Sequence, residues 1–415
     1  MSDQMKWASA LSQKASLEAA VQEVAEQAQT ALGRSADLGL LFISSAFTSE
    51  YSRLMPLVKE VLQVPHLIGC SGGGVIGNNA MGQPEELEQQ AAVSLCLASL
   101  PGVTVHSFQI SPEDLPDLDG PPERWVDLVG VSPQDEPSFI LLADPFSSGI
   151  NDLLQGLDFA YPGAVKVGGL AGVGSLNNRS GLFCNYERYQ EGTVGLALSG
   201  NIVMEAIVAQ GCRPIGRPYR VAEGDRNVLL KLEEPVAVKV GASSELRTPL
   251  EILQEIFQTL DEKDRELAQS SLFVGIAQSE FKQILDSGDF LIRNLLGVDP
   301  RNGAIAIGDR VRPGQRIQFH LRDARASEED LTTLLKAYMA QKTPTAPYPA
   351  GALMFSCMGR GQGLYGQENF DSELFRRHLH GTPLAGFFCG GEIGPVGNST
   401  FLHGYTSVFG ICRQP

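Results

Sequence analysis

The side chains best suited to chemistry gather near the carboxyl end of the chain, in the stretch PLAGFFCGGEIGPVGNSTFLH (383–403). This stretch holds a thiol at Cys389, a carboxylate at Glu392 and an imidazole at His403. A second thiol, Cys357, lies upstream in FSCMGRG. A cysteine nucleophile needs a base within hydrogen-bonding reach and a group that orients this base. The residue types for thiol catalysis are therefore present, but spacing alone does not bring them together.

The surroundings of these residues favour a structural role. Cys357 and Cys389 lie in the apolar contexts MFSCM and GFFCG, where a thiol is usually an inert, buried side chain. His403 has no second histidine at metal-ligand spacing, and the seven cysteines include no CxxC pair. We therefore predict no catalytic residue, no metal and no cofactor. An enzyme that uses Cys357 or Cys389 with His403 is kept as an alternative.

Two charged residues suggest a binding site instead. Arg360 can hold a carboxylate through two parallel hydrogen bonds, and Glu392 can receive an ammonium group. Together they would suit an amino acid. The alternative is a salt bridge between Arg360 and Glu392 that fastens two loops and binds nothing.

Glycine-rich loops provide the other candidate contacts. GCSGGGVIG and GGLAGVG carry neither the Lys-Ser/Thr of a phosphate-binding loop nor an acidic residue at the ribose distance of a dinucleotide fold, so they predict tight turns with free amide donors rather than a nucleotide site. The predicted ligand-binding residues are Arg360, Glu392, Cys357, Gly390, Gly391, Asn398, His403, Ser44, Ser45, Ser71, Gly72 and Gly169.

Three similar segments of sequence position these residues. Each has an apolar strand that ends in polar residues, then a helical pattern, a strand that ends in glycines, and a returning antiparallel strand. The segments begin with LGLLFISSAF (38–47), SFILLADPFS (138–147) and GALMFSCMGRG (351–361). About thirty residues separate the strand start from the glycine run, which is the length of a βαβ unit. We predict an α/β to α+β fold with mixed sheets, whose polar strand ends and glycine loops collect at one edge.

The expected domain organisation has three parts. Apolar residues from Trp7 to Ala28 recur at helical spacing, which predicts an N-terminal amphipathic helix within residues 1–34. One half then covers residues 35–240 and a second half residues 241–415, with the boundary in the charged stretch 241–245.

Composition restricts the partners. The 415 residues include 48 acidic and 32 basic side chains, for a net charge of −16, which repels phosphate backbones and anionic lipid. The N-terminus lacks the pattern of a signal peptide, and no segment has about twenty uncharged apolar residues. We therefore expect a cytoplasmic protein that neither binds nucleic acid nor inserts into a membrane.

Five separated motifs resemble one known family. GCRPIG, GDFLIRNLLGVDP, GAIAIGDRVRPGQRIQFHLRDA, FSCMGRGQGLYG and PLAGFFCGGEIGPVGNSTFLHGYTSVFGI together are similar to the FIST proteins, with an N-terminal and a C-terminal FIST half between about Leu38 and Cys412. This resemblance implies a sensory module for small ligands, proposed in the family to recognise amino acids or related metabolites. Relatives often carry a signalling domain or an F-box, so the output partner here is expected to be either a separate signalling protein or absent. A protein-binding scaffold without a ligand is a further alternative.

Overall fold

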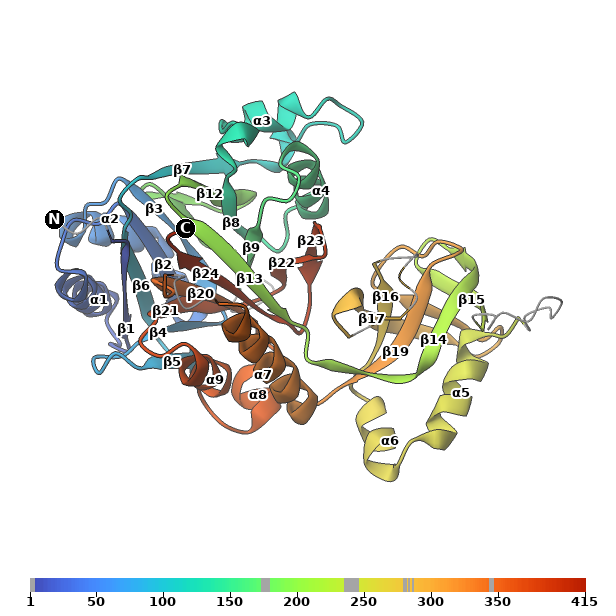
Figure 1. Cartoon of the computed structure of the whole chain (residues 1–415). Helices are drawn as coiled ribbons and strands as arrows, with labels where there is room; N and C mark the ends of the chain where they lie inside the picture. Colours follow the sequence, from blue (N-terminus) through green and yellow to red (C-terminus); the bar gives the residue numbers. More distant parts are fainter. Residues whose placement is uncertain are drawn as a thin grey trace. The chain divides into compact units, whose positions relative to one another are not determined.

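The computed structural model describes residues 4–172, 180–234, 246–278, 282, 284, 285, 287–342 and 347–415. The chain forms two compact units (Figure 1). Met1–Ala209 and Thr332–Pro415 make up the first, which we call the three-repeat unit, and Gln210–Leu331 makes up the second, which we call the barrel unit.

The three-repeat unit contains the same series of strands three times, with helices at equivalent places and one additional short helix, α8, in the third repeat. The first repeat consists of β1 (Lys6–Ser12), α1 (Leu17–Leu32), β2 (Leu38–Ser44), α2 (Tyr51–Val61), β3 (His66–Gly72), β4 (Gly74–Asn78), β5 (Pro84–Glu88) and β6 (Val93–Ser99). The second consists of β7 (Val103–Ile110), α3 (Glu123–Val129), β8 (Ser138–Ala143), α4 (Ile150–Ala160), β9 (Lys166–Leu170), β10 (Leu182–Cys184), β11 (Glu187–Tyr189) and β12 (Thr193–Gly200). The third consists of β13 (Val203–Ala209), α7 (Ala324–Gln341), β20 (Gly351–Cys357), α8 (Gly361–Tyr365), α9 (Phe370–His378), β21 (Leu384–Cys389), β22 (Glu392–Val396), β23 (Ser399–His403) and β24 (Ser407–Arg413).

The repeats build three six-stranded sheets of identical plan. Their strand orders are β1-β6-β2-β3-β10-β11, β7-β12-β8-β9-β22-β23 and β13-β24-β20-β21-β4-β5. In each sheet one central pair is parallel (β2 with β3, β8 with β9, β20 with β21) and the other pairs are antiparallel. The last two strands of each sheet are a hairpin from another repeat, so the three repeats exchange hairpins in a cycle. The predicted mixed sheets of repeated strand–helix–strand segments are confirmed.

One glycine recurs at the same place in each repeat. Gly69, Gly168 and Gly386 lie opposite Leu41, Leu141 and Met354 in the three parallel pairs. A methyl group added at any of the three would collide with the carbonyl oxygen of the residue opposite. Glycine is required here because the two backbones approach closely.

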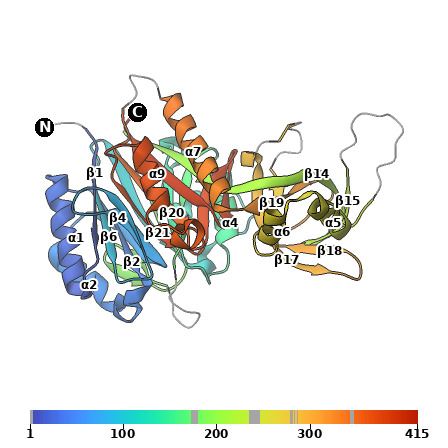
Figure 2. The same cartoon turned by 90° about the horizontal axis from the view of Figure 1, so that it is seen from below.

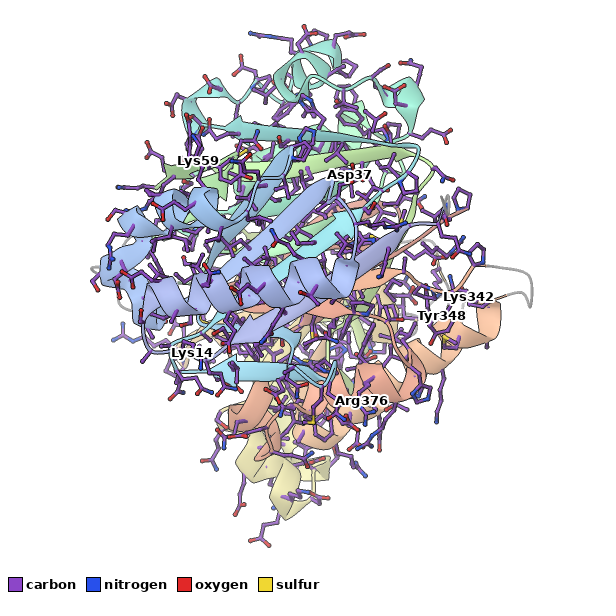
Figure 3. The ribbon with its side chains drawn as sticks, turned by 90° about the vertical axis from the view of Figure 1, so that its left-hand side faces the viewer. Lys14, Asp37, Lys59, Lys342, Tyr348 and Arg376 are labelled. Atoms are coloured by element: carbon purple, nitrogen blue, oxygen red, sulfur yellow. The ribbon has the colours of Figure 1, made fainter. Side chains whose placement is uncertain are left out.

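The apolar core has an inner and an outer part. Side chains on the inner faces of the three sheets form one core; Phe387 of β21 stacks on Phe42 of β2 at 5.2 Å and meets Phe355 of β20 edge-on at 5.8 Å. The outer faces are covered by helices, for example α1 and α2 over the first sheet (Figure 3) and α3 and α4 over the second. Strands such as 38–44 are apolar throughout because one face meets helices and the other meets the neighbouring sheets.

The barrel unit interrupts the third repeat between the end of β13 and the middle of α7, whose residues up to Leu331 belong to the barrel unit. Its strands form a closed barrel in the order β14-β15-β18-β17-β16-β19 (Figure 2). The elements are β14 (Cys212–Asp225), β15 (Val228–Glu233), α5 (Pro249–Thr259), α6 (Glu262–Ala268), β16 (Leu272–Ala277), β17 (Phe290–Asp299), β18 (Ala304–Ile307) and β19 (Arg316–Arg322). A capping box between Thr248 and Glu251 begins α5.

The structure corrects one prediction at the N-terminus. The segment 1–34 is not a single helix, because Lys6–Ser12 forms strand β1 at the edge of the first sheet and only Leu17–Leu32 is helical. Trp7 and Leu11 suggested a helix because they are four residues apart, but they lie on a strand that is buried along most of its length. The predicted boundary at 241–245 lies outside the described residues. Among the helices that are described, none combines the length and apolarity needed to cross a bilayer.

Candidate functional site

The glycine runs of the three repeats meet in a ring of backbone hydrogen bonds. Each run donates one N–H to the glycine-ended strand of another repeat: Gly73 to the carbonyl of Phe388 at 3.0 Å, Gly172 to Ser71 at 2.8 Å, and Gly390 to Leu170 at 3.0 Å. The three donors and the three acceptors occupy equivalent positions in the repeats, so the cycle is closed. The expected convergence of the glycine loops is therefore present, and it joins all three repeats rather than two.

Five of the predicted ligand-binding residues lie in or beside this ring. The Ser71 hydroxyl donates to the carbonyl of Gly172 at 2.9 Å and accepts from the N–H of Gly181 at 3.0 Å. The carbonyl of Gly391 accepts from the N–H of Leu170 at 2.7 Å, beside Gly390. The remaining two are Gly72 and Gly169. These hydrogen bonds join strands of different repeats, so the glycines permit close contact between backbones.

Strands β2, β8 and β20 end at or next to equivalent positions, which are occupied by Ser44, Asp144 and Cys357. In the first repeat, the Ser44 hydroxyl accepts from the N–H of Ala92 at 3.1 Å, and Ser45 begins a short 3-10 turn. In the second, the Asp144 carboxylate accepts from the N–H of Phe146 at 3.2 Å and from the hydroxyls of Ser147 at 2.9 Å and Ser180 at 2.5 Å.

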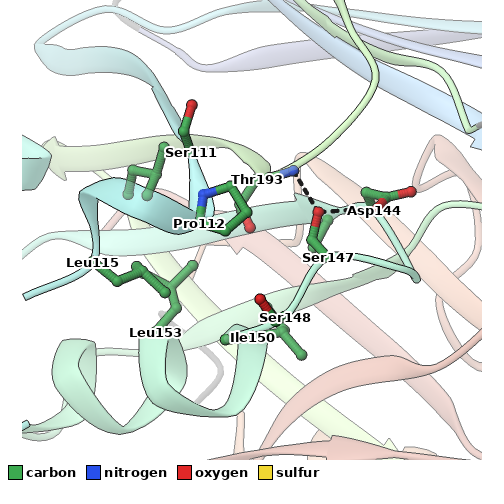
Figure 4. Close-up of a pocket in the computed structure, with 13 residues that line it drawn as sticks. Ser111, Pro112, Leu115, Asp144, Ser147, Ser148, Ile150, Leu153 and Thr193 are labelled. Carbon is green, nitrogen blue, oxygen red and sulfur yellow. Dashed lines mark hydrogen bonds between the residues drawn. The ribbon is translucent and has the colours of Figure 1, made fainter.

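A cavity at the second strand end is closed by its own side chains. The Ser147 hydroxyl donates to Asp144 and accepts from the N–H of Gly192 at 2.7 Å, and both hydrogen bonds are drawn as dashed lines in Figure 4. The cavity volume is ≈ 10 Å³, which is about the space of one water molecule. The polar groups here satisfy one another and leave no room for a metabolite.

The third strand end differs from the other two. Ser356 of β20 lies directly opposite Ser407 of β24, and both side chains are fully buried. Neither hydroxyl has a hydrogen-bond partner among the residues that the structure describes. Cys357, the next residue, is partly exposed and donates its N–H to the carbonyl of Thr406 at 3.0 Å.

The charged residues at this end are also buried. Glu392 is fully buried and accepts from the N–H of Thr406 at 3.1 Å. Arg360 is fully buried too, and the carboxylate that holds its guanidinium in a salt bridge comes from Asp371 on α9. The hydroxyl of Tyr365 contacts both partners, at 2.6 Å from Arg360 Nη2 and 2.8 Å from Asp371 Oδ1.

The remaining predicted residues are placed by the β22–β23 hairpin. His403 pairs with Glu392 across the two strands, and its Nε2 lies 3.0 Å from the carbonyl oxygen of Gly394. Asn398 is exposed in the turn at the opposite end of this hairpin. The structure therefore brings His403 and Glu392 together and does not bring Asn398 to them.

The buried thiol in the glycine run is unsuited to nucleophilic attack. Cys389 is fully buried and donates to the carbonyl of Phe387 at 3.5 Å. Burial, reinforced by the negative charge of Glu392, raises the pKa of Cys389 well above its usual value. The protonated thiol is a poor nucleophile. Within the described ranges, no three His, Cys, Asp or Glu side chains form a group that could hold a metal ion.

Sequence reasoning missed four residues of this region: Asp371, Glu86, Ser356 and Ser407. Ser356 and Ser407 interrupt otherwise apolar strands, in LMFSC and YTSVF, and this interruption was the available signal. Asp371 lies in an ordinary helical pattern and Glu86 lies in an acidic run, so neither is distinguished by its sequence context.

Comparison with known proteins agrees with this architecture. Residues 37–234 match the FIST N domain and residues 249–395 match the FIST C domain. The chain is 33% identical over 405 residues to the Uncharacterized protein Rv0628c of Mycobacterium tuberculosis, with 94% of each chain covered. It is 32% identical over 393 residues to the Uncharacterized protein Mb0898c of Mycobacterium bovis, again with 94% of each covered. The two domain matches, which together cover most of the chain, show that it belongs to the FIST family.

Proposed function

We propose that this protein is a cytoplasmic sensory protein that binds a small polar metabolite, with an amino acid as the favoured class, and passes the binding event to a separate signalling protein. FIST domains are consistent with a sensory role in signal transduction. The ligand would bind at the carboxyl end of β20, where Ser356, Ser407 and Glu392 supply the polar contacts.

A pair of buried serines that occurs in the third repeat supports this location, because the positions of Ser356 and Ser407 hold Ile43 and Val93 in the first repeat and Ala143 and Thr193 in the second. The polar residues one position further along, Ser44 and Asp144, are satisfied by the chain's own N–H and hydroxyl groups. Ser356 and Ser407 are equally buried, yet their hydroxyls have no partner in the described part of the chain. A buried hydroxyl without a hydrogen bond costs about 1–3 kcal/mol, so a ligand that bonds to both would be stabilised by removing this cost.

The ring of glycine runs supplies a route from binding to signalling. The N–H groups of Gly73, Gly172 and Gly390 join each repeat to another, so a shift at one strand end is transmitted to a neighbouring repeat. A ligand that prefers one arrangement of the ring would shift the population toward it.

Native mass spectrometry of gently purified protein tests the proposal. We expect a discrete extra mass that is lost in Ser356→Ala and Ser407→Ala and retained in Ser199→Ala, a matched control on β12, the strand equivalent to β24. Since neither the Ser356 nor the Ser407 hydroxyl makes a hydrogen bond in the described structure, both variants should fold normally. If the chain carries no extra mass and no amino acid, peptide or organic acid raises its Tm, the proposal is wrong, because a bound ligand must stabilise the folded state.

A further inference from the structure

An acidic pocket lies beside the Arg360–Asp371 pair in the three-repeat unit. Its volume is ≈ 250 Å³, and its wall includes the four carboxylates of Glu85, Glu86, Glu88 and Glu368. Four amide side chains and Leu87 make up the rest of the described lining, which contains no lysine or arginine. The pocket is therefore strongly negative, and a ligand that enters it must be cationic or neutral.

One of these carboxylates is buried and incompletely satisfied. Glu86 is only 5% exposed, and its Oε1 accepts from the N–H of Ser372 at 2.6 Å. Its Oε2 has no hydrogen-bond partner among the residues that the structure describes. Protonation would not remove this deficit, because the protonated oxygen would then need an acceptor. Glu86 lines the pocket, so a cationic donor that reaches Oε2 from there would satisfy it.

The wall around Glu86 is held in place by other hydrogen bonds. Asn369 accepts from the N–H of Glu86 at 2.6 Å, Glu88 accepts from the N–H of Gln362 at 2.8 Å, and Glu85 accepts from the side chain of Asn79 at 2.6 Å. The first two contacts join β5 to the segments around α8 and α9, and the third lies within the β4–β5 hairpin. The pocket is thus formed before any ligand arrives, which lowers the cost of binding.

We propose that this acidic pocket binds a small organic amine whose ammonium group donates to Glu86 Oε2, with Glu88 and Glu368 balancing its charge. A divalent metal fits less well, because within the described residues the acidic side chains do not converge as a coordination site. The site shares no residue with Ser356, Ser407 or Glu392, so it is independent of the metabolite site proposed above.

Amine binding at Glu86 should change the number of protons that the protein holds. Burial, and the negative charge of Asp371 behind it, raise the pKa of Glu86 to about 7. The other groups that face it are the Ser372 N–H and the Glu88 carboxylate, while Arg360 is engaged by Asp371. An ammonium group against Glu86 favours its ionised form, so binding near pH 7 must release protons.

Isothermal titration calorimetry of the full chain with 1,4-diaminobutane tests the proposal, with 1,4-butanediol as the neutral isostere. We expect the diamine to bind and the diol not to bind, and the heats in two buffers of different ionisation enthalpy to differ by the protons released. Glu86→Gln keeps an acceptor for Ser372 and should weaken diamine binding about 10- to 100-fold, the value of one hydrogen bond between charged groups. It should also abolish the proton release.

Controls separate this site from general charge attraction and from the metabolite site. Glu60→Gln removes the same charge from an exposed position on α2 and should leave diamine binding unchanged, as should Ser356→Ala. If Glu86→Gln lowers the Tm strongly, the double variant Glu88→Gln/Glu368→Gln replaces it, with the same expected loss of affinity. The proposal is overturned if the diamine does not bind, if the diol binds equally well, if Glu60→Gln weakens binding as much, or if binding releases no protons.

Discussion

Arg360 and Asp371 form a doubly hydrogen-bonded ion pair from which water is excluded. Nε lies 2.7 Å from Oδ2 and Nη2 lies 3.1 Å from Oδ1, and both side chains are fully buried. The pair joins the end of β20 to the start of α9, so the guanidinium holds together the loop in which it lies. It is the only one of the described salt bridges in which both side chains are fully buried.

Removal of Arg360 should destabilise the protein strongly. Arg360→Ala leaves the Asp371 carboxylate buried without its charge partner, which typically costs 3–5 kcal/mol. Urea unfolding should show a loss of about this size. Arg376→Ala breaks the exposed pair of Arg376 with Glu373 on the same helix and should cost at most about 1 kcal/mol. Equal losses in the two variants would contradict the structural role given to the buried pair.

The recurring glycine should be equally sensitive in all three repeats. Gly69→Ala, Gly168→Ala and Gly386→Ala each place a methyl group against the carbonyl oxygen of the parallel strand opposite. Overpacking of this kind costs about 1–3 kcal/mol or more, because the strands must move apart. Gly363→Ala, on α8 where nothing lies within 4 Å of the added carbon, should be neutral or slightly stabilising. Differential scanning calorimetry of the four variants measures this contrast.

The repeats could be predicted from the sequence, but the pairing between them could not. Apolar strands followed by glycine runs at constant spacing identify three βαβ segments, because strand and helix periodicities are local properties. The exchange of the hairpins β4–β5, β10–β11 and β22–β23 is not local. An alternating pattern shows which face of a strand is buried but not which sheet it joins, so the closed ring at Gly73, Gly172 and Gly390 appears only in the structure.

The candidate site could also be predicted only in part, because its contacts depend on how distant segments pack together. Glycines and charges near strand ends suggested Arg360 and Glu392, and both lie in the buried polar region at the end of β20. The partner of Arg360 depends on how α9 packs, and the chain supplies Asp371. Ser356 and Ser407 become notable only when the register places them opposite each other.

Thiol labelling should distinguish Cys357 from the other six cysteines. Cys357 is partly exposed, whereas Cys70, Cys96, Cys184, Cys212, Cys389 and Cys412 are buried. Iodoacetamide at neutral pH should therefore add one group per folded chain, located at Cys357 by peptide mass spectrometry. Rapid labelling at Cys389 would contradict the raised pKa of this thiol and would favour the cysteine-dependent enzyme.

Glu86 should make the protein less stable as the pH rises. Its pKa is about 7 in the folded protein and 4.5 without the fold, so the folded state binds more protons between these values. Its contribution to the free energy of unfolding therefore falls through this window, by on the order of 3 kcal/mol. Glu86→Gln removes the titration, so the stability of the variant relative to the native protein should increase between about pH 5 and pH 8. Urea unfolding at both pH values measures this difference, and a constant difference would contradict it.

His320 should have the opposite effect in the barrel unit. Burial against Phe290 lowers the pKa of His320 to about 4 from its usual 6.5, so the unfolded chain binds more protons between these values. The stability contributed by the neutral imidazole is fully present above about pH 6.5 and is lost as the pH falls through about 4, with a total on the order of 3 kcal/mol.

Replacing the imidazole isolates the part of the pH dependence of stability that comes from His320. His320→Leu cannot take up a proton, so its stability relative to the native protein should increase as the pH is lowered from about 7 to about 4.5. Hydrogen exchange of the β16 and β19 amides in the full chain reports opening of the barrel at each pH. His380→Leu, at an exposed position, should show no such trend.

Glu86 and His320 take up protons in overlapping pH ranges, but with opposite effects on stability. Lowering the pH should therefore destabilise the barrel unit through His320 and stabilise the three-repeat unit through Glu86. If β16 and β19 stay protected in acid while the strands of the three-repeat unit open first, the assignment of the acid-sensitive group to His320 is wrong.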